Sequence, residues 1–362
     1  MNLKRKRINL NSYYIAIGVC ALFIIGVSLM KDDTLWIEKY YAQTIYPVVS
    51  YIYIILFSWV PFSIGDVIYG GILGLFIFLI TAFLKSIFRK RFYEVKVYLV
   101  RIITFISVLY VVFLVNWGLN YYRQPVRERL GLQDSSFTKE EYLKVVENYI
   151  HQANALRAKI DWKEKTKLGV RGDLAEIVKQ DTQLSGYLCK TQVHVKEPVS
   201  SLLASFFMVS GYFNPFTLEA HVNQHIPKAS YPFVHVHELG HQLGIGFEDE
   251  CNFYAFLVLH EDKDLWYRYS AYYSALGYLL RPLYRDKVLW EKYRAMLSSL
   301  VLEDMREESD FWRAHQGWLE KVSGAFYDEY LKANNQPEGM ERYSLMVKLL
   351  VAWEKQRQEA RR

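Results

Sequence analysis

His237-Glu238-Leu239-Gly240-His241 is the stretch that decides how this chain folds and which chemistry it can perform. Residues four apart on a helix share one face, with their Cβ atoms about 5–6 Å apart. His237 and His241 can therefore direct two imidazole nitrogens at one metal ion, and zinc accepts such nitrogens at about 2.0–2.1 Å. Glu238 lies at the edge of that face, where its carboxylate can take a proton from water at the metal without binding the metal. The stretch predicts a zinc site with His237 and His241 as ligands and Glu238 as the catalytic base.

The residues around this motif favour a helix over about 231–243. Ser230 and Pro232 are suited to a helix start, and Gly244 and Gly246 provide a stop. The alternative is an ordinary helix that carries two incidental histidines. Because the HExxH spacing on a helix is typical of zinc metallopeptidases, we predict an enzyme of this class, with Zn²⁺ as its cofactor.

The apolar residues are concentrated in the first third of the chain. Three segments, about 13–30, 67–84 and 99–118, are each long and apolar enough to cross a bilayer as a helix. The third contains Arg101 near its start, whose long side chain can reach the headgroups. A fourth segment, 46–65, also lacks charged residues and is ambiguous. The chain is therefore predicted to be a multi-pass protein of the cell membrane, in contact with the lipid bilayer.

Basic residues determine the predicted orientation. Lys and Arg occupy positions 4–7 before the first span, and a second basic cluster lies at 85–96 between the second and third spans. Because cytoplasmic loops are enriched in Lys and Arg, we expect the N-terminus and the 85–96 loop to be cytoplasmic. Both conditions hold if 46–65 does not cross, so this segment is predicted to be re-entrant or interfacial on the outer face. No small-residue cleavage site follows Met30, so the first span is predicted to be a retained anchor.

This orientation divides the chain into a membrane domain, 1–118, and an extracytoplasmic domain, 119–362. The net charge of +6 reflects the cytoplasmic flanks, and without a basic stripe interleaved with aromatic residues we expect no nucleic-acid partner. Cys20 lies in the first span, which leaves Cys189 and Cys251 as the possible external pair. The sequence leaves their pairing open, and we expect free buried thiols. It also leaves the oligomeric state open.

Local patterns predict an α+β, mostly helical fold for the outer domain. Thr138 and Glu141 form a capping box that starts a helix. Alternating residues predict short strands, and acidic residues after the motif predict a second helix beside the metal helix. The other expected elements are helices at about 172–184 and 248–260 and strands at 191–195 and 217–222.

A catalytic zinc site needs a third protein ligand beside the two histidines. The candidates in the sequence are Glu248, Asp249, Glu250, His260, His221 and His225. A turn at 244–246 would fold the next helix back against the metal helix. Glu250 would then share an inward face with Tyr254, whereas Glu248 lies roughly 200° away around the helix. We predict Glu250 as the third ligand and keep Glu248 as the alternative; Asp249 is expected to favour the helix N-terminus or to orient a histidine.

Substrate-binding groups are also expected near the motif. Segment 217–223 would hold an extended substrate by backbone hydrogen bonds if it forms an edge strand beside the cleft. A phenol or cation must stabilise the oxyanion, and Tyr254, His225 or Tyr343 could serve, among which the sequence does not choose. His235 points away from the motif's metal face and is expected in the core or on the surface.

The chain resembles a known family over nearly its whole length. The segment Glu248-Asp249-Glu250-Cys251-Asn252 after the motif resembles the Glu-x-Glu-Ala-Asn pattern of gluzincin-like peptidases, in which the second Glu binds zinc. More broadly, the chain resembles the bacterial membrane-protein family of domain of unknown function 3810. The resemblance rests on segments 36–41, 61–66, 116–123, 214–220, 237–241, 267–270 and 330–333. It implies several transmembrane helices, here three, followed by an extracytoplasmic zincin-like metallopeptidase domain. It also favours Glu250 as ligand, and Cys251 stands where the family pattern has Ala.

These observations lead to one predicted function and two alternatives. The predicted function is a membrane-anchored zinc metallopeptidase that cleaves a peptide or protein substrate outside the cytoplasm, with Glu238 as the general base. An intramembrane protease is excluded because Gln242, Glu248, Asp249 and Glu250 follow the motif, whereas such an enzyme carries the motif inside a hydrophobic span. The first alternative is a sensor subunit whose zinc domain signals across the membrane through a partner. The second is a scaffold with an inactive metal site, which would have no need of Glu238.

Overall fold

The architecture comes from a computed structural model, which describes residues 8–132, 137–182, 184, 186, 188, 193–337 and 345–360. The N-terminal part, called the membrane part because it contains four helices that could cross a membrane, comprises α1 Asn11–Met30, α2 Thr34–Trp36, the π-helix η1 Ile37–Ile45, α3 Tyr46–Phe57, α4 Ile64–Phe88, α5 Phe92–Asn116, the 3-10 helix η2 Gly118–Tyr122 and α6 Val126–Arg129. The following part begins with α7 Lys139–Arg157, α8 Val170–Gln180, β1 Val195–Lys196, α9 Ser201–Phe206, β2 Gly211–Asn214 and β3 Glu219–Val222. It ends with α10 Tyr231–Gln242, α11 Glu248–Leu259, α12 Leu265–Leu280, the 3-10 helix η3 Arg281–Arg285, α13 Lys287–Arg294, α14 Ser299–His315, α15 Trp318–Ala333 and α16 Leu345–Glu359. The fold is mostly helical with one small sheet, as predicted.

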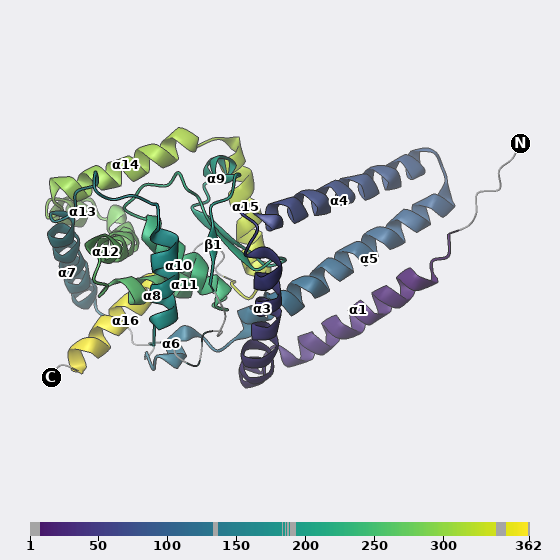
Figure 1. The fold of residues 1–362 in the computed structure, drawn as a ribbon, viewed down its shortest axis with the longest axis horizontal. Coiled ribbons are helices and arrows are strands. Elements are labelled where there is room, and N and C mark those ends of the chain that lie inside the picture. The colour runs from purple at the N-terminus through teal and green to yellow at the C-terminus, as the bar shows by residue number, and fades with distance from the viewer. Residues whose placement is uncertain are drawn as a thin grey trace, which may run out of the picture.

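Three long helices, α1, α4 and α5, project side by side from one side of the rest of the molecule (Figure 1). By length and composition, four helices of the described chain could cross a membrane rather than the three predicted. The additional one, Thr34–Phe57, joins α2, η1 and α3. Its α3 part lies crosswise at the base of the three projecting helices in Figure 1. The sequence analysis missed its full length because Glu38 and Lys39 interrupt the apolar run.

A three-stranded sheet lies beside α10, the helix that carries His237 and His241 and is called the metal helix below, and its strand order is β1-β3-β2. β3 pairs with β1 in parallel, with Val195 opposite Ala220, and with β2 in antiparallel, with Gly211 opposite Val222. The predicted strand at 217–222 therefore exists as β3, over Glu219–Val222, and it lies in the centre of the sheet, so the condition for substrate binding at its edge is not met. The parallel partner β1 covers one side of it. Of the predicted strand at 191–195, Val195 lies in β1, Val193 and His194 are not in a strand, and 191 and 192 lie outside the described residues.

Most of the buried apolar residues of the described chain belong to two groups. The larger group lies among α7, α10, α11, α12 and α16, and its first helix begins at the predicted capping box, with Thr138 Oγ1 accepting a hydrogen bond from the amide of Glu141. The smaller group joins Tyr46 and Trp117 of the membrane part to Leu218 and Phe247 beside the metal helix. The membrane part and the metal part therefore share a hydrophobic core at their junction.

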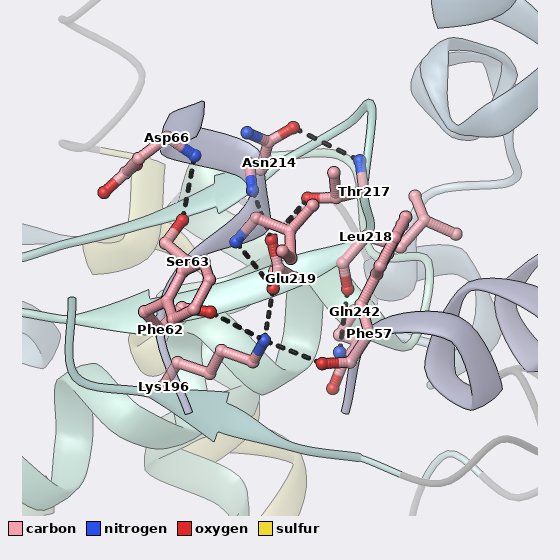
Figure 2. Close-up of polar contacts among 12 residues, drawn as sticks. Phe57, Phe62, Ser63, Asp66, Lys196, Asn214, Thr217, Leu218, Glu219 and Gln242 are labelled. Carbon is pink, nitrogen blue, oxygen red and sulfur yellow. Dashed lines mark hydrogen bonds and ion pairs between the residues drawn. The ribbon is translucent and has the colours of Figure 1, made fainter. Parts of the chain in front are cut away.

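A buried ion pair fastens the sheet to the turn between α3 and α4 (Figure 2). Lys196 Nζ contacts Glu219 Oε1 and donates to the carbonyl oxygens of Phe57, at 2.8 Å, and Phe62, at 3.1 Å. Glu219 Oε2 accepts a hydrogen bond of 2.6 Å from the amide of Gly65, in the first turn of α4. A carboxylate at this position satisfies amide groups that have no partner within the helix. The pair thus joins the end of one membrane-proximal helix, the start of the next and the sheet.

Candidate metal centre

Two helices bring three potential metal ligands together. His237 and His241 lie one turn apart on α10, and Glu248 is the first residue of α11. The Nε2 atoms of His237 and His241 lie 3.2 and 3.5 Å from the Glu248 carboxylate oxygens. One ligand atom from each of the three residues lies within 4.8 Å of the others, and all three side chains are buried. These residues could hold a metal ion.

The predicted third ligand, Glu250, does not lie beside the histidines. Its Oε1 accepts a hydrogen bond of 2.8 Å from the amide of Val126, at the start of α6. The face of α11 that meets the histidines carries Glu248 and, one turn later, Asn252. Since residues two apart differ by roughly 200° around a helix, Glu250 points elsewhere. The candidate ligand is corrected from Glu250 to Glu248, and packing of α11 between α10 and α6 is the physical reason.

A glycine turn between the two helices makes this arrangement possible. Gly244 has φ +91°, a left-handed conformation that side chains with a Cβ rarely adopt. A Cβ on Gly246 would lie 2.8 Å from the backbone oxygen of Asn120, so only glycine allows this close approach. The predicted turn at 244–246 is therefore confirmed, and it brings Glu248 to His237 and His241.

Both histidines are oriented through their other ring nitrogen. Nδ1 of His237 lies 2.9 Å from Oδ1 of Asn252, and Nδ1 of His241 lies 2.9 Å from the carbonyl oxygen of Ile245. An oxygen partner requires Nδ1 to carry the proton, which leaves the lone pair of Nε2 for a metal. The sequence analysis missed Asn252, although its position four residues after Glu248 places both residues on one helix face.

Residues next to the membrane helices hold the end of α10. Trp117 Nε1 donates to the carbonyl of His241 at 3.1 Å, and the Tyr46 hydroxyl donates to that of Gln242 at 2.8 Å. Arg123 Nη1 donates to the carbonyl of Gly244 at 3.0 Å and forms an ion pair with Glu38. Carbonyls in the last turn of a helix lack partners within the helix. The membrane-proximal segments supply these partners and so fix the helix that carries the histidines.

Glu238 occupies the position expected of a base. The side chain is buried, and no described residue offers a hydrogen bond to its Oε2. A Cβ on Gly211 of β2 would lie 2.5 Å from Glu238 Oε1, so the glycine leaves room for the carboxylate. Burial raises the pKa of Glu238 to about 7, although His237 and His241 oppose the rise. A carboxyl group with this pKa can both accept and donate a proton near neutral pH.

A cleft of about 2580 Å³ runs past these residues. Its lining includes Glu238, His237, His241 and Glu248 from the metal site and Gly211 and Phe213 from β2. Further lining residues are Asp66 and Tyr69 of α4, Tyr273 and Tyr278 of α12, and Tyr327 and Tyr330 of α15. The Tyr327 hydroxyl donates a hydrogen bond of 2.7 Å to Glu248 Oε1. No signal near the motif could have identified Tyr327, because α15 lies far along the chain.

Of the three residues predicted to stabilise the oxyanion, the two that the structure describes, Tyr254 and His225, lie away from the cleft. Tyr254 is buried in the larger core against Gly240 and does not line the cleft. His225 is exposed and is likewise absent from the cleft lining. Tyr343 lies outside the described residues. The tyrosines of α12 and α15 occupy the cleft instead.

His221 and His260, which were candidate ligands, and His235, which was predicted to lie in the core or on the surface, are buried away from the metal centre. His221 stacks on Tyr212 with ring centroids 4.4 Å apart, and burial lowers its pKa to about 4. His235 is fully buried, which lowers its pKa to about 3, and His260 stacks on Phe256 with ring centroids 5.0 Å apart. Burial away from water disfavours the charged form of His221 and His235, so both imidazoles are neutral near pH 7.

Cys251 is a buried free thiol next to the site, as predicted. Its Sγ lies 3.3 Å from Nδ1 of His241, and burial raises its pKa to about 12. A neutral thiol is a poor metal ligand. Its proposed partner Cys189 lies outside the described residues.

The chain belongs to the family described as "Protein of unknown function (DUF3810)", which it matches over residues 41–351. No curated protein and no solved structure matches the chain. The family match agrees with the resemblance seen in the sequence and leaves the chemistry to be inferred from the site.

Proposed function

We propose that this DUF3810 protein is a membrane-anchored zinc metallopeptidase that hydrolyses peptide bonds outside the cytoplasm. In this proposal His237, His241 and Glu248 bind the metal, and Glu238 is the general base. The observation that carries the proposal is the convergence of three ligand atoms beside a buried carboxylate whose Oε2 has no described hydrogen-bond partner and which lines a large cleft. The alternative in which the motif is an ordinary helix gives no reason for this convergence.

The donor set suits zinc. Two imidazole nitrogens and one carboxylate oxygen form the ligand set of several catalytic zinc sites, which keep a further position open for water or substrate. The oxygen partners of both Nδ1 atoms, from Asn252 and Ile245, support the ligand tautomer that this role needs. When bound, zinc supplies Lewis acidity, which polarises a carbonyl group and lowers the pKa of water to about 7.

The protein's own residues then divide the remaining tasks. Glu238 takes the proton of the attacking water and passes it to the leaving amine, for which a pKa near neutrality is favourable. The edge strand β2 aligns an extended peptide by backbone hydrogen bonds. Tyr327 is the phenol that we assign to the oxyanion: its hydroxyl lies beside the ligand Glu248 and would exchange its hydrogen bond to that carboxylate for one to the substrate.

We further infer that α1, α4 and α5 span the membrane, while Thr34–Phe57 lies at its outer face. The crosswise position of α3 in Figure 1 and the burial of Tyr41 and Tyr46 support this assignment. With the basic residues around 4–7 and 85–96 in the cytoplasm, the metal centre faces the outside.

The test uses the full chain purified in detergent, because the metal part shares a core with the membrane part. Elemental mass spectrometry should find about one zinc per chain in the wild type and in Glu250→Ala, and a strong loss in Glu248→Ala. Hydrolysis of a mixed peptide library should occur with the wild type, and Glu238→Gln should retain zinc but lose activity. Zinc binding without hydrolysis of any peptide would favour a sensor role instead, and a chain without zinc would refute the proposal.

A further inference from the structure

The cleft beside the metal centre reaches the start of a membrane helix. Asp66 and Tyr69, in the first two turns of α4, belong to its lining. From Val67 onward this helix exposes apolar side chains, among them Val67 and Leu73, as a helix in contact with lipid does. The cleft therefore opens at the level where the apolar surface of α4 begins.

Strand β2 separates this helix from the metal helix. Gly211 and Phe213 face α10, since Gly211 adjoins Glu238 and the Phe213 ring lies 6.3 Å from that of His241. Tyr212 faces α4, where its hydroxyl donates to Asp66 Oδ1 at 2.6 Å. Side chains alternate between the two faces of a strand, so one short strand contacts both the membrane helix and the metal site.

The outer edge of β2 is available for a further strand, because it pairs only with β3 among the described strands. An extended polypeptide can add to such an edge through backbone hydrogen bonds. The cleft volume of about 2580 Å³ also exceeds the roughly 300–1,000 Å³ typical of small-molecule sites. Both features favour a polypeptide over a small metabolite.

The rim of the cleft is apolar where it approaches the membrane helices. Helices α9 and α15 contribute both to the cleft lining and to an exposed apolar surface that consists of Leu202, Leu203, Phe206, Trp318, Val322 and Phe326. Tyr330 ties α15 to the end of α5, because its ring contacts Phe113 at 6.4 Å and its hydroxyl lies 3.2 Å from that of Tyr121. Figure 1 shows α15 beside the base of α4. Exposed apolar and aromatic residues at this level suit the interfacial region of a bilayer.

We propose that the substrate is the juxtamembrane segment of a membrane-anchored polypeptide, which enters along α4 and adds to the edge of β2. This inference rests on the proposed peptidase function. Packed layers of secondary structure lie on the order of 10 Å apart, and an extended chain covers about 3.3–3.6 Å per residue. Because β2 lies between α4 and α10, one to two such spacings separate the start of α4 from the metal centre, and the scissile bond therefore lies about three to six residues from the end of the substrate's membrane span.

Cleavage of matched reporter proteins tests the position of the cut. Each reporter carries a randomised ten-residue segment, placed either directly after a single membrane helix or after an added 30-residue Gly/Ser spacer, and is reconstituted with the full zinc-loaded chain in liposomes. Mass spectrometry of released fragments should show at least tenfold more cleavage of the membrane-adjacent library, with cuts about three to six residues from the helix. Equal cleavage of both libraries would overturn the inference and leave the peptidase function intact.

A crosslinking measurement separates binding from catalysis. A photo-reactive residue replaces Tyr69 in the Glu238→Gln chain, and Leu168, an exposed residue outside the cleft, serves as the matched control position. Crosslinks to the membrane-adjacent library at 69, and none at 168, are expected. Such crosslinks without cleavage by the wild type would support the substrate class and refute the peptidase function. Crosslinks to lipid alone, or equal crosslinking of the spacer library, would overturn the inference.

Discussion

Loss of one partner of the buried ion pair between Lys196 and Glu219 should destabilise the fold more than loss of both charges together. The two side chains are only 3% and 5% exposed, and Lys196 also satisfies the carbonyl groups of Phe57 and Phe62. Lys196→Met would leave the Glu219 charge buried without its cation. Loss of one partner of a buried pair typically costs about 3–5 kcal/mol.

Removal of both charges should restore part of this loss. In the double variant Lys196→Met/Glu219→Gln no buried charge remains, and the Gln side-chain oxygen can still accept from the amide of Gly65 as Glu219 does. We therefore expect the double variant to lose less stability than the sum of the single variants, with a coupling energy of about 1–3 kcal/mol. The single variant Glu219→Gln should be destabilised because it leaves Lys196 charged.

Thermal unfolding of the full chain in detergent, followed by tryptophan fluorescence, measures these effects. Since 1 kcal/mol corresponds to about 2–4 °C for large domains, Lys196→Met should lower the Tm by on the order of 10 °C. Arg313→Met is the matched control, because Arg313 and Asp310 form a surface pair that is 68% and 58% exposed. Its shift should not exceed about 3 °C. A Lys196→Met shift no larger than that of the control, or strict additivity in the double variant, would refute the reasoning.

Four further predictions concern the metal centre. Glu248→Ala should weaken zinc binding at least about 100-fold in a chelator competition. Glu250→Ala should leave zinc binding unchanged, because Glu250 accepts a hydrogen bond from the amide of Val126. A larger loss in Glu250→Ala than in Glu248→Ala would restore Glu250 as the ligand. Asn252→Ala should weaken zinc binding about 10–100-fold, because His237 Nδ1 loses the oxygen that orients its ring. Asn252→Asp should retain zinc binding, because the aspartate supplies an oxygen at the same place. Equal losses in the two variants would argue against Asn252 as the residue that orients His237. Gly211→Ala should lower kcat by at least about tenfold with zinc content unchanged. The added Cβ would lie 2.5 Å from Glu238 Oε1 and so displace the carboxylate of the base. Full activity of this variant would show that Glu238 can shift without loss of its function. The rate of peptide hydrolysis should fall as the pH drops, because Glu238 must be ionised to act as a base. Burial raises the pKa of Glu238 to about 7, and a bound metal cation should lower it, so the midpoint of the pH–rate profile should lie below pH 7. A rate that is constant down to pH 4 would argue against Glu238 as the base.

Features that depend on local spacing could be predicted from the sequence. His237 and His241 share a face because they are four residues apart on one helix, and the capping box at Thr138 begins its helix wherever that helix packs. The apolar segments that became α1, α4 and α5 were found from composition, because lipid-facing residues need no specific partner. The longer helix Thr34–Phe57 was missed because Glu38 interrupts its apolar run. The ion pair that neutralises Glu38 is formed with Arg123, far along the chain, and so could not be seen from the local sequence.

Only the tertiary structure decided which groups meet at the metal centre. The sequence placed Glu248 and Glu250 on different faces of one helix, but the packing of α11 against α10 and α6 determined that Glu248 faces the histidines. Strand order likewise placed β3 in the centre of the sheet and left β2 and β1 as its two edge strands. Tyr327 reaches Glu248 from α15. The motif alone determined His237 and His241 as candidate ligands and Glu238 as candidate base, because their relative positions follow from helix periodicity. The third ligand and the cleft depend on packing between segments that are distant in sequence, and this packing cannot be predicted from local sequence patterns.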